Sequence, residues 1–201
     1  MKPSKQIPPE VIGLIEAGID QAAERLAKIS HTSWFIQTTS IKPASLDKVT
    51  QAAGDGPEDV GVFLGMPDGI FLVIFPTPNA EAVAAAFMAQ TEWKKPAPEM
   101  KGKILSEVAN IIANAVADVL ANACNRAAFL GAPSVETGTR SELIDRIPGK
   151  INGGSHTMTF MIYVHLSSSA ISADCMMVIG LGGDWEPALL RAAQRSKEEG
   201  A

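Results

Sequence analysis

Apolar residues recur at helical spacing within the first thirty positions of the chain. They are Val11, Ile12, Ile15, Ile19, Ala22, Leu26 and Ile29. Residues three, four or seven positions apart share one face of an α-helix, and proline is favoured in the first turn. The pattern after Pro8-Pro9 therefore predicts an amphipathic helix over about residues 9–29, with one face in a core.

A β pattern follows this helix. A strand is expected over about residues 34–41, ended by Lys42-Pro43. Two apolar runs, 60–64 and 70–75, flank Pro67-Asp68-Gly69. Proline presets φ and glycine accepts a positive φ, so these runs are predicted to form a hairpin. A second helix is then expected over about residues 79–90, with Asn79 as its N-cap.

The same order of elements is predicted again in the second half of the chain. A proline-rich linker is predicted at 93–98, before the second half begins. The secondary structure of residues 141–148 is ambiguous, and residues 151–154 are predicted to form a loop. The elements are a long helix 98–130 stopped by Gly131, a strand 134–137, a hairpin 157–166 and 171–181 around Ser167-Ser168-Ser169, and a helix 185–197 capped by Asp184.

Helix, strand, hairpin and helix thus occur twice, in pseudo-repeats of about 8–92 and 98–197. We therefore expect a single domain over 1–201 of the α/β (α+β) class. Its predicted architecture is a pseudo-two-fold duplicated unit in which the hairpins form an antiparallel sheet and the two long helices share one face.

Composition narrows the function classes. Of 201 residues, 46% are hydrophobic and 19% charged, which is typical of a globular chain. The net charge of −5 and the lack of a basic cluster argue against nucleic acid, and no apolar run suggests a membrane span. No signal peptide is visible, so a cytoplasmic location is expected. Cys124 and Cys175 lie in apolar stretches, so buried free thiols in a reducing cytoplasm are expected, with a disulfide as the minor alternative. Neither cysteine has metal-ligand spacing, so no metal site is expected.

The long helix of the second half carries a polar stripe. Its members are Glu107, Asn110, Asn114 and Asp118. At 100° per residue they fall within an arc of roughly 80°. A separate arc of the same helix is apolar and is predicted to face the core, and it holds Ile104, Val108, Ile111, Ile112, Ala115 and Val119. A solvated helix face is the ordinary interpretation. Asparagine, however, has poor helix propensity, so two asparagines on one face hint at a selected role.

The pattern Glu107-x-x-Asn110, with 22 residues between Asn110 and Pro133, resembles the signature of the CheC/CheX/FliY family of chemotaxis phosphatases. The run Ala-Asn-Ile-Ile-Ala-Asn-Ala at 109–115 and the duplicated layout are also similar to that family. The specific motif covers only residues 103–133, whereas the likeness of architecture covers nearly the whole chain.

Two departures from the family pattern stand out. The family has Asp or Ser four residues before the glutamate, where this chain has Lys103. In the first half, Glu16 aligns with Glu107, but the amide position is Ile19. Isoleucine cannot orient water, so the first site is expected to be degenerate. One active site in two halves is closer to CheX than to the two-site CheC proteins.

The resemblance implies removal of the phosphoryl group from the aspartate of a phosphorylated CheY-like receiver domain. Glu107 would pair with the receiver's active-site lysine, and Asn110 would hold the attacking water in line. No cofactor of its own is implied, because the receiver would supply Mg²⁺. Lys103, Asn114 and Asp118 are candidate docking residues, with simple solvation as the alternative for the last two.

Other interpretations remain open at this stage. The chain could be a non-catalytic CheC-like binding or scaffold module, in a flagellar switch or with a receptor deamidase. The apolar runs 158–164 and 176–179 could bury a homodimer interface or form sheet core. His165 has no acidic neighbour in sequence, so it is predicted to be a sheet-face residue.

Overall fold

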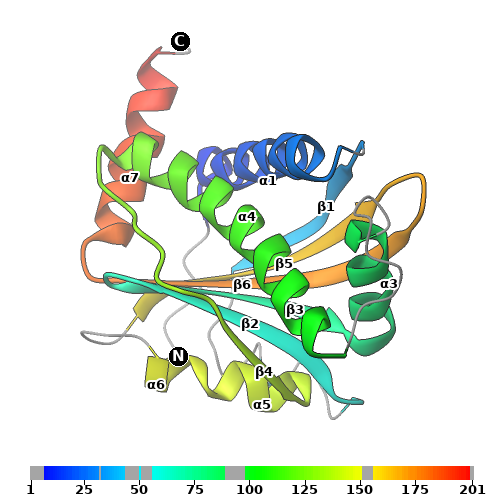
Figure 1. Cartoon of the computed structure of the whole chain (residues 1–201). Helices are drawn as coiled ribbons and strands as arrows, with labels where there is room; N and C mark the ends of the chain where they lie inside the picture. The colour runs from blue at the N-terminus through cyan, green and yellow to red at the C-terminus, as the bar shows by residue number, and fades with distance from the viewer. Residues whose placement is uncertain are drawn as a thin grey trace.

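The computed structural model describes residues 7–31, 33–43, 50, 56–88, 98–150 and 156–199. In this part of the chain, six antiparallel strands form one sheet, with helices packed on it (Figure 1). The elements are α1 (Pro9–Ser30), β1 (Phe35–Pro43), β2 (Asp59–Met66), β3 (Gly69–Pro76), α3 (Thr77–Met88), α4 (Pro98–Cys124), β4 (Ser134–Gly138), α5 (Arg140–Asp145), α6 (Ile147–Lys150), β5 (His156–Ser167), β6 (Ser172–Gly182) and α7 (Trp185–Glu199).

The strand order is symmetric between the two halves. It runs β1-β5-β6-β3-β2-β4, and exchanging the halves reproduces the same order in reverse. The two hairpins, β2–β3 and β5–β6, meet in the middle through β3 and β6. Each single strand pairs with the hairpin of the other half, β1 with β5 and β4 with β2. The predicted pseudo-two-fold architecture is confirmed, and the exchange of partners adds a feature that periodicity did not predict.

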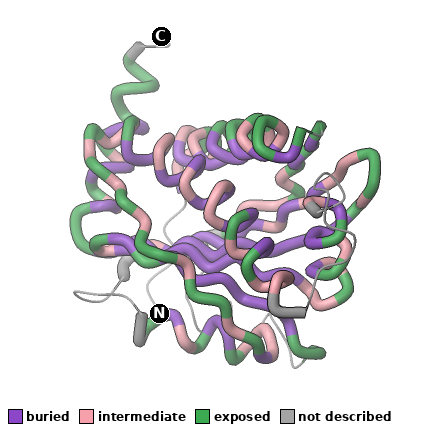
Figure 2. The backbone as a smooth tube through the Cα atoms, in the orientation of Figure 1, coloured by how far each residue is buried: buried purple, intermediate pink, exposed green. Residues whose placement is uncertain are grey.

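The long helices α1 and α4 lie on the same face of the sheet, as predicted (Figure 1). They form the main core with the buried residues of that face. The backbone of buried residues is purple in Figure 2. The two helices approach closely at Gly18, because a Cβ atom there would lie 2.6 Å from Val116 Cα. The opposite face carries a smaller core under α5 and α6, which includes Leu72, Leu143 and Val178.

The long helix α4 ends at Cys124 and not near Leu130 as predicted. Asn125 adopts a left-handed conformation with φ 52°. Its N–H donates to Asn122 O at 3.1 Å, and Arg126 N–H donates to Ala121 O at 2.9 Å. These are the two bonds of a Schellman motif, in which asparagine can replace glycine. The predicted helix was too long because residues 127–130 are apolar and continue the pattern of the helix beyond its end.

Two local predictions also need correction, and one ambiguous stretch is resolved. Asn79 is not a cap, because α3 begins at Thr77 and the Asn79 Nδ2 donates to Asp174 O at 2.8 Å. In the β2–β3 turn the positive φ, 57°, belongs to Asp68 and not to Gly69. The ambiguous stretch 141–148 is helical, and Thr139 with Glu142 forms a capping box at the start of α5. The linker 93–97 and the loop 151–154 lie outside the described residues.

One described helix, Met100–Cys124, is long and apolar enough to cross a membrane by length and composition alone. Of its most apolar window, 67% is buried inside the protein. The apolar character of α4 is therefore accounted for by its place in the main core.

Candidate functional site

The helix α4 is buried around most of its circumference, which sets its polar strip apart. The buried positions are Ile104, Leu105, Val108, Ala109, Ile112, Ala113, Ala115, Val116, Ala117, Leu120 and Ala121. Of the six residues predicted to face the core, Ile111 and Val119 are only half-buried. We define the polar strip as Lys103, Glu107, Asn110, Asn114 and Asp118. Because the backbone beneath it is held by the core, side chains on this strip start from a rigid support.

Glu107 and Asn110 lie on adjacent turns of the strip. Glu107 is exposed and makes no hydrogen bond or ion pair with another described residue. Asn110 is half-buried, less open than the sequence suggested. A carboxylate and a carboxamide at i and i+3 project side by side, so one partner surface can meet both.

The Asn110 amide has an internal partner. Asn114 Nδ2 lies 2.7 Å from Asn110 Oδ1 and 2.8 Å from the backbone oxygen of Asn110. The side-chain oxygen of Asn110 therefore already accepts one hydrogen bond from within the protein. The side-chain nitrogen of Asn110, Nδ2, has no hydrogen-bond acceptor among the described residues. It is also not a buried atom, because the one buried side-chain N or O atom without a partner among those residues is Glu10 Oε2. Asn110 Nδ2 therefore reaches solvent.

The ends of the strip differ in character. Lys103 is exposed one turn before Glu107, and no described residue forms an ion pair with it. At the other end, Asp118 Oδ2 accepts from Arg25 Nη2 of α1 at 2.7 Å, with both side chains about two-fifths exposed. This contact ties the strip to α1, so any docking role of Asp118 would have to include or displace Arg25.

Exposed apolar side chains lie near the first turns of α4 and on the connection that follows the helix. Gly102 of α4 lies beside Val135 of β4, since a Cβ at Gly102 would be 3.8 Å from Val135 Cγ1. Val135 is 39% exposed, and Phe129, on the connection between α4 and β4, is 78% exposed. Pro133 is half-buried directly before β4. The motif proline thus directly precedes the strand that contacts α4 at Gly102.

The position in the first half that corresponds to Asn110 carries no polar group. Glu16 is exposed on α1, but Ile19 is 1% exposed and belongs to the main core. The two halves share an architecture and differ in chemistry, because one half turns a polar amide outward where the other buries an aliphatic side chain.

No protein-family model and no curated protein sequence matches this chain. Solved structures do. FliY from Thermotoga maritima aligns with a TM-score of 0.73 at 13% identity, over 97% of this chain and 99% of that one. CheX from Desulfovibrio desulfuricans gives 0.53 at 13% identity, over 84% and 99%. The FliM middle domain from H. pylori gives 0.57 at 10% identity, over 92% and 99%.

The chain has the fold of the CheC/CheX/FliY family. This confirms the resemblance stated from the motif at the level of architecture. At identities of 10–13%, the likeness shows a shared fold and does not assign roles to individual residues. Those roles have to be argued from the local geometry.

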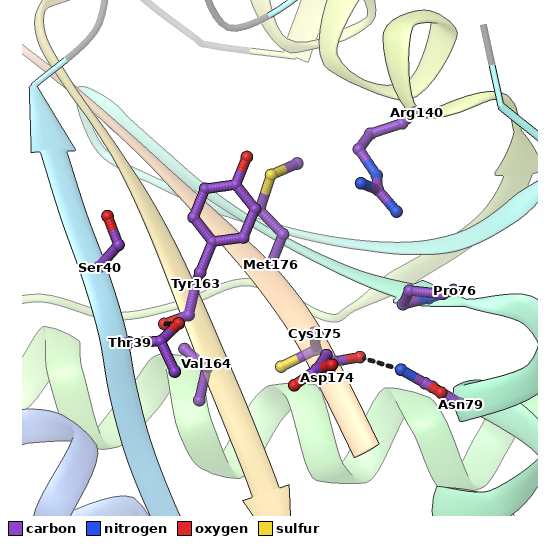
Figure 3. A pocket seen from close by; sticks show the side chains of 10 residues that line it. All are labelled: Thr39, Ser40, Pro76, Asn79, Arg140, Tyr163, Val164, Asp174, Cys175 and Met176. Atoms are coloured by element: carbon purple, nitrogen blue, oxygen red, sulfur yellow. Dashed lines mark hydrogen bonds between the residues drawn. The ribbon is translucent and has the colours of Figure 1, made fainter. Parts of the chain in front are cut away.

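This CheC-like domain also has a pocket of about 430 Å³ away from the polar strip (Figure 3). None of its described lining residues comes from α4. Tyr163 of β5 and Arg140 of α5 extend toward it, and Arg140 Nη2 is held 2.9 Å from Oδ2 of the buried Asp59. The Arg140 guanidinium at this pocket is therefore already paired with a carboxylate of the fold.

A polar network beside that pocket was missed from sequence. His165 Nδ1 lies 2.6 Å from Asp174 Oδ1, and His165 Nε2 lies 3.1 Å from Ser172 Oγ. His165 faces Asp174 directly across the β5–β6 ladder. The prediction of a sheet-face histidine agrees with this position, but its acidic partner could be found only from the hairpin register, counted back from the turn.

The two cysteines are free, as expected. Burial raises the pKa of Cys175 to about 12, with a smaller contribution from the Asp174 carboxylate. Burial also raises the pKa of the half-buried Cys124, partly opposed by Arg126, Arg195 and Arg191. Neither thiol is activated as a nucleophile. The described residues contain no cluster of three metal-ligating side chains.

Proposed function

We propose that this CheC-like protein hydrolyses the aspartyl phosphate of a CheY-like receiver domain in chemotaxis or a related two-component pathway. The supporting observation is the pair formed by the exposed Glu107 carboxylate and the Asn110 carboxamide on a helix anchored in the core. Reaching into another protein's active site requires such side chains on a rigid element, since positioning dominates phosphoryl transfer.

The chemistry needs little from this chain. Water attacks phosphorus in line, the bond to the aspartyl oxygen breaks, and inorganic phosphate leaves while the receiver's carboxylate is regenerated. Asn110 would orient the water, and Glu107 would pair with the receiver's lysine and hold the complex in register. The receiver's own Mg²⁺ would neutralise the charge on the phosphoryl oxygens. Such a reaction would take place in the cytoplasm, where receiver domains act.

A binding module is the second candidate, and two observations favour it. The FliM middle domain shares the fold, and one solved complex pairs FliM with FliG. In addition, Lys103 occupies the motif's small polar position. A scaffold of this kind would bind its partner through the same polar strip without changing the lifetime of any phosphoryl group.

The deciding experiment uses a receiver domain from the same organism, phosphorylated with a small-molecule donor. Release of inorganic phosphate is followed with and without this protein. We expect faster release with the wild-type chain and no acceleration with Asn110→Ala. Binding of the phosphorylated receiver without acceleration would favour the scaffold. If no receiver binds or is dephosphorylated faster, the proposed phosphatase function is wrong.

A further inference from the structure

We propose that Asn114 is a positioning residue that sets which end of the Asn110 amide faces a docked partner. The motif assigns Glu107 and Asn110 but not Asn114, which the sequence suggested for docking. The inference rests on the proposed phosphatase function for its catalytic meaning, but the positioning itself is a property of this protein alone.

The backbone determines the orientation of both amides. The carbonyl oxygen of Asn110 can only accept, so the Asn114 atom facing it at 2.8 Å must be Nδ2. The same Nδ2 lies 2.7 Å from the Asn110 side chain, so the facing atom there must accept and is Oδ1. The assignment of oxygen and nitrogen thus follows from the network and leaves one consistent arrangement.

This arrangement divides the Asn110 amide into two functional ends. Oδ1 has two lone pairs, and Asn114 uses one, so the other can accept a proton of the attacking water. Nδ2 reaches solvent and can donate to a phosphoryl oxygen. An amide that accepts from water and donates to phosphate orients the nucleophile through two contacts, whereas a freely rotating amide would present its ends at random.

The local structure fits positioning better than docking for Asn114. Both protons of its Nδ2 have internal acceptors one turn back on the helix. Side-chain bonding of this kind competes with regular helix formation, and asparagine is a poor helix former. Asn114 therefore lowers the stability of the helix. A residue that served only to solvate an exposed helix face would not need to be an asparagine.

The first test is made on the protein alone. Asn114→Leu keeps a similar volume and removes both donors. Side-chain amide NMR signals and χ1 couplings of Asn110 are measured in the wild type, in Asn114→Leu and in the matched control Asn122→Leu, which alters an exposed asparagine farther along the same helix. We expect one Asn110 rotamer in the wild type and the control, and averaging in Asn114→Leu. An unchanged single rotamer in Asn114→Leu overturns the proposal.

The second test measures turnover. Asn114→Leu should lower kcat roughly 10- to 100-fold, as expected for misplaced catalytic groups, with little change in half-saturation by the receiver. Asn114→Asp should also lose kcat, because a carboxylate attracts Nδ2 of Asn110 and turns its oxygen outward. In an Asn110→Ala background, Asn114→Leu should have no further effect, since a positioning residue acts only through the residue it positions.

The outcomes separate the two proposals. A large change in half-saturation with kcat unchanged would make Asn114 a docking residue and overturn the positioning role. A rise in kcat in Asn114→Leu would mean that the bond restrains the site, which also overturns it. If no receiver is dephosphorylated by the wild type while the Asn110 rotamer still depends on Asn114, the phosphatase function fails and the positioning stands.

Discussion

Gly18 of α1 lies directly against the backbone of Val116 on α4, and a Cβ atom there would be only 2.6 Å from Val116 Cα. The crossing of the two long helices therefore has no room for a side chain. We expect Gly18→Ala to lower the free energy of unfolding by roughly 1–3 kcal/mol through overpacking. Chemical denaturation monitored by circular dichroism measures this change.

Gly13 offers a matched control on the same helix. No atom lies within 4 Å of a Cβ placed there, and its φ is ordinary for a helix. Gly13→Ala should stabilise the protein by roughly 0.5–1 kcal/mol, because alanine has the higher helix propensity. Equal effects of the two substitutions would contradict the close crossing.

Asn110→Ala should abolish stimulated dephosphorylation of the receiver and leave the fold intact. The side chain is only half-buried, so its removal creates no enclosed cavity. Phosphate release at saturating protein measures the loss, and a thermal melt checks the fold. The control is Asn122→Ala, which removes an exposed amide from α4 outside the polar strip. Full activity of Asn110→Ala would refute its proposed role.

Glu107→Ala should weaken docking of the phosphorylated receiver more than it slows the bound reaction. An ion pair across a partly desolvated interface typically contributes a few kcal/mol, so half-saturation should rise roughly 10-fold or more. Glu16→Ala is the matched control, since Glu16 is exposed at the corresponding place on α1. The assignment fails if half-saturation is the same in Glu107→Ala and the wild type.

Ile19→Asn should not create a second active site. Ile19 is 1% exposed, so the substitution removes core contacts and buries an amide without assured partners. We expect a loss of about 3 kcal/mol or more in the free energy of unfolding. Denaturation quantifies the cost, and phosphate release should stay at the level given by Asn110 alone. A stable variant with doubled turnover would show that the first half retains a working site.

The Cys175 thiol gives a pH-dependent prediction. Its pKa is raised from 9.0 to about 12 by burial in the folded protein. Above pH 9 the unfolded chain loses this proton while the folded chain keeps it, so ionisation favours unfolding as the pH rises toward 12. Relative to Cys175→Ala, the wild type should lose stability over this interval. A thiol reagent at pH 8 should modify Cys175 only after denaturation.

Periodicity predicted the long helices and hairpins well, because each is a strong local pattern. The start of α1 and the β2–β3 hairpin required only the spacing of apolar residues and a turn sequence. The end of α4 was missed because Asn125, which ends the helix, is followed at residues 127–130 by apolar residues that continue the helical pattern. The helix α5 could have been predicted, since Thr139 and Glu142 have capping-box spacing.

For the candidate site, sequence predicted the polar strip but not its internal contacts. The Asn114–Asn110 bond depends on rotamers, and helical spacing only makes it possible. Asp118 and Arg25, which are 93 residues apart in the sequence, join two helices through their contact. The partner of His165 depends on the register of two strands. Such relationships arise from tertiary packing, which a single sequence does not specify position by position.

The exchange of strand partners has a consequence during synthesis. Phe35 of β1 pairs with Ser167 and Pro43 pairs with Phe160, so β1 has no sheet partner until β5 has been synthesised. Until then the backbone N–H and C=O groups of β1 lack the partners that they have in the sheet, and unpaired strands of this kind favour aggregation. The six-stranded sheet is therefore complete only when strands from both halves are present.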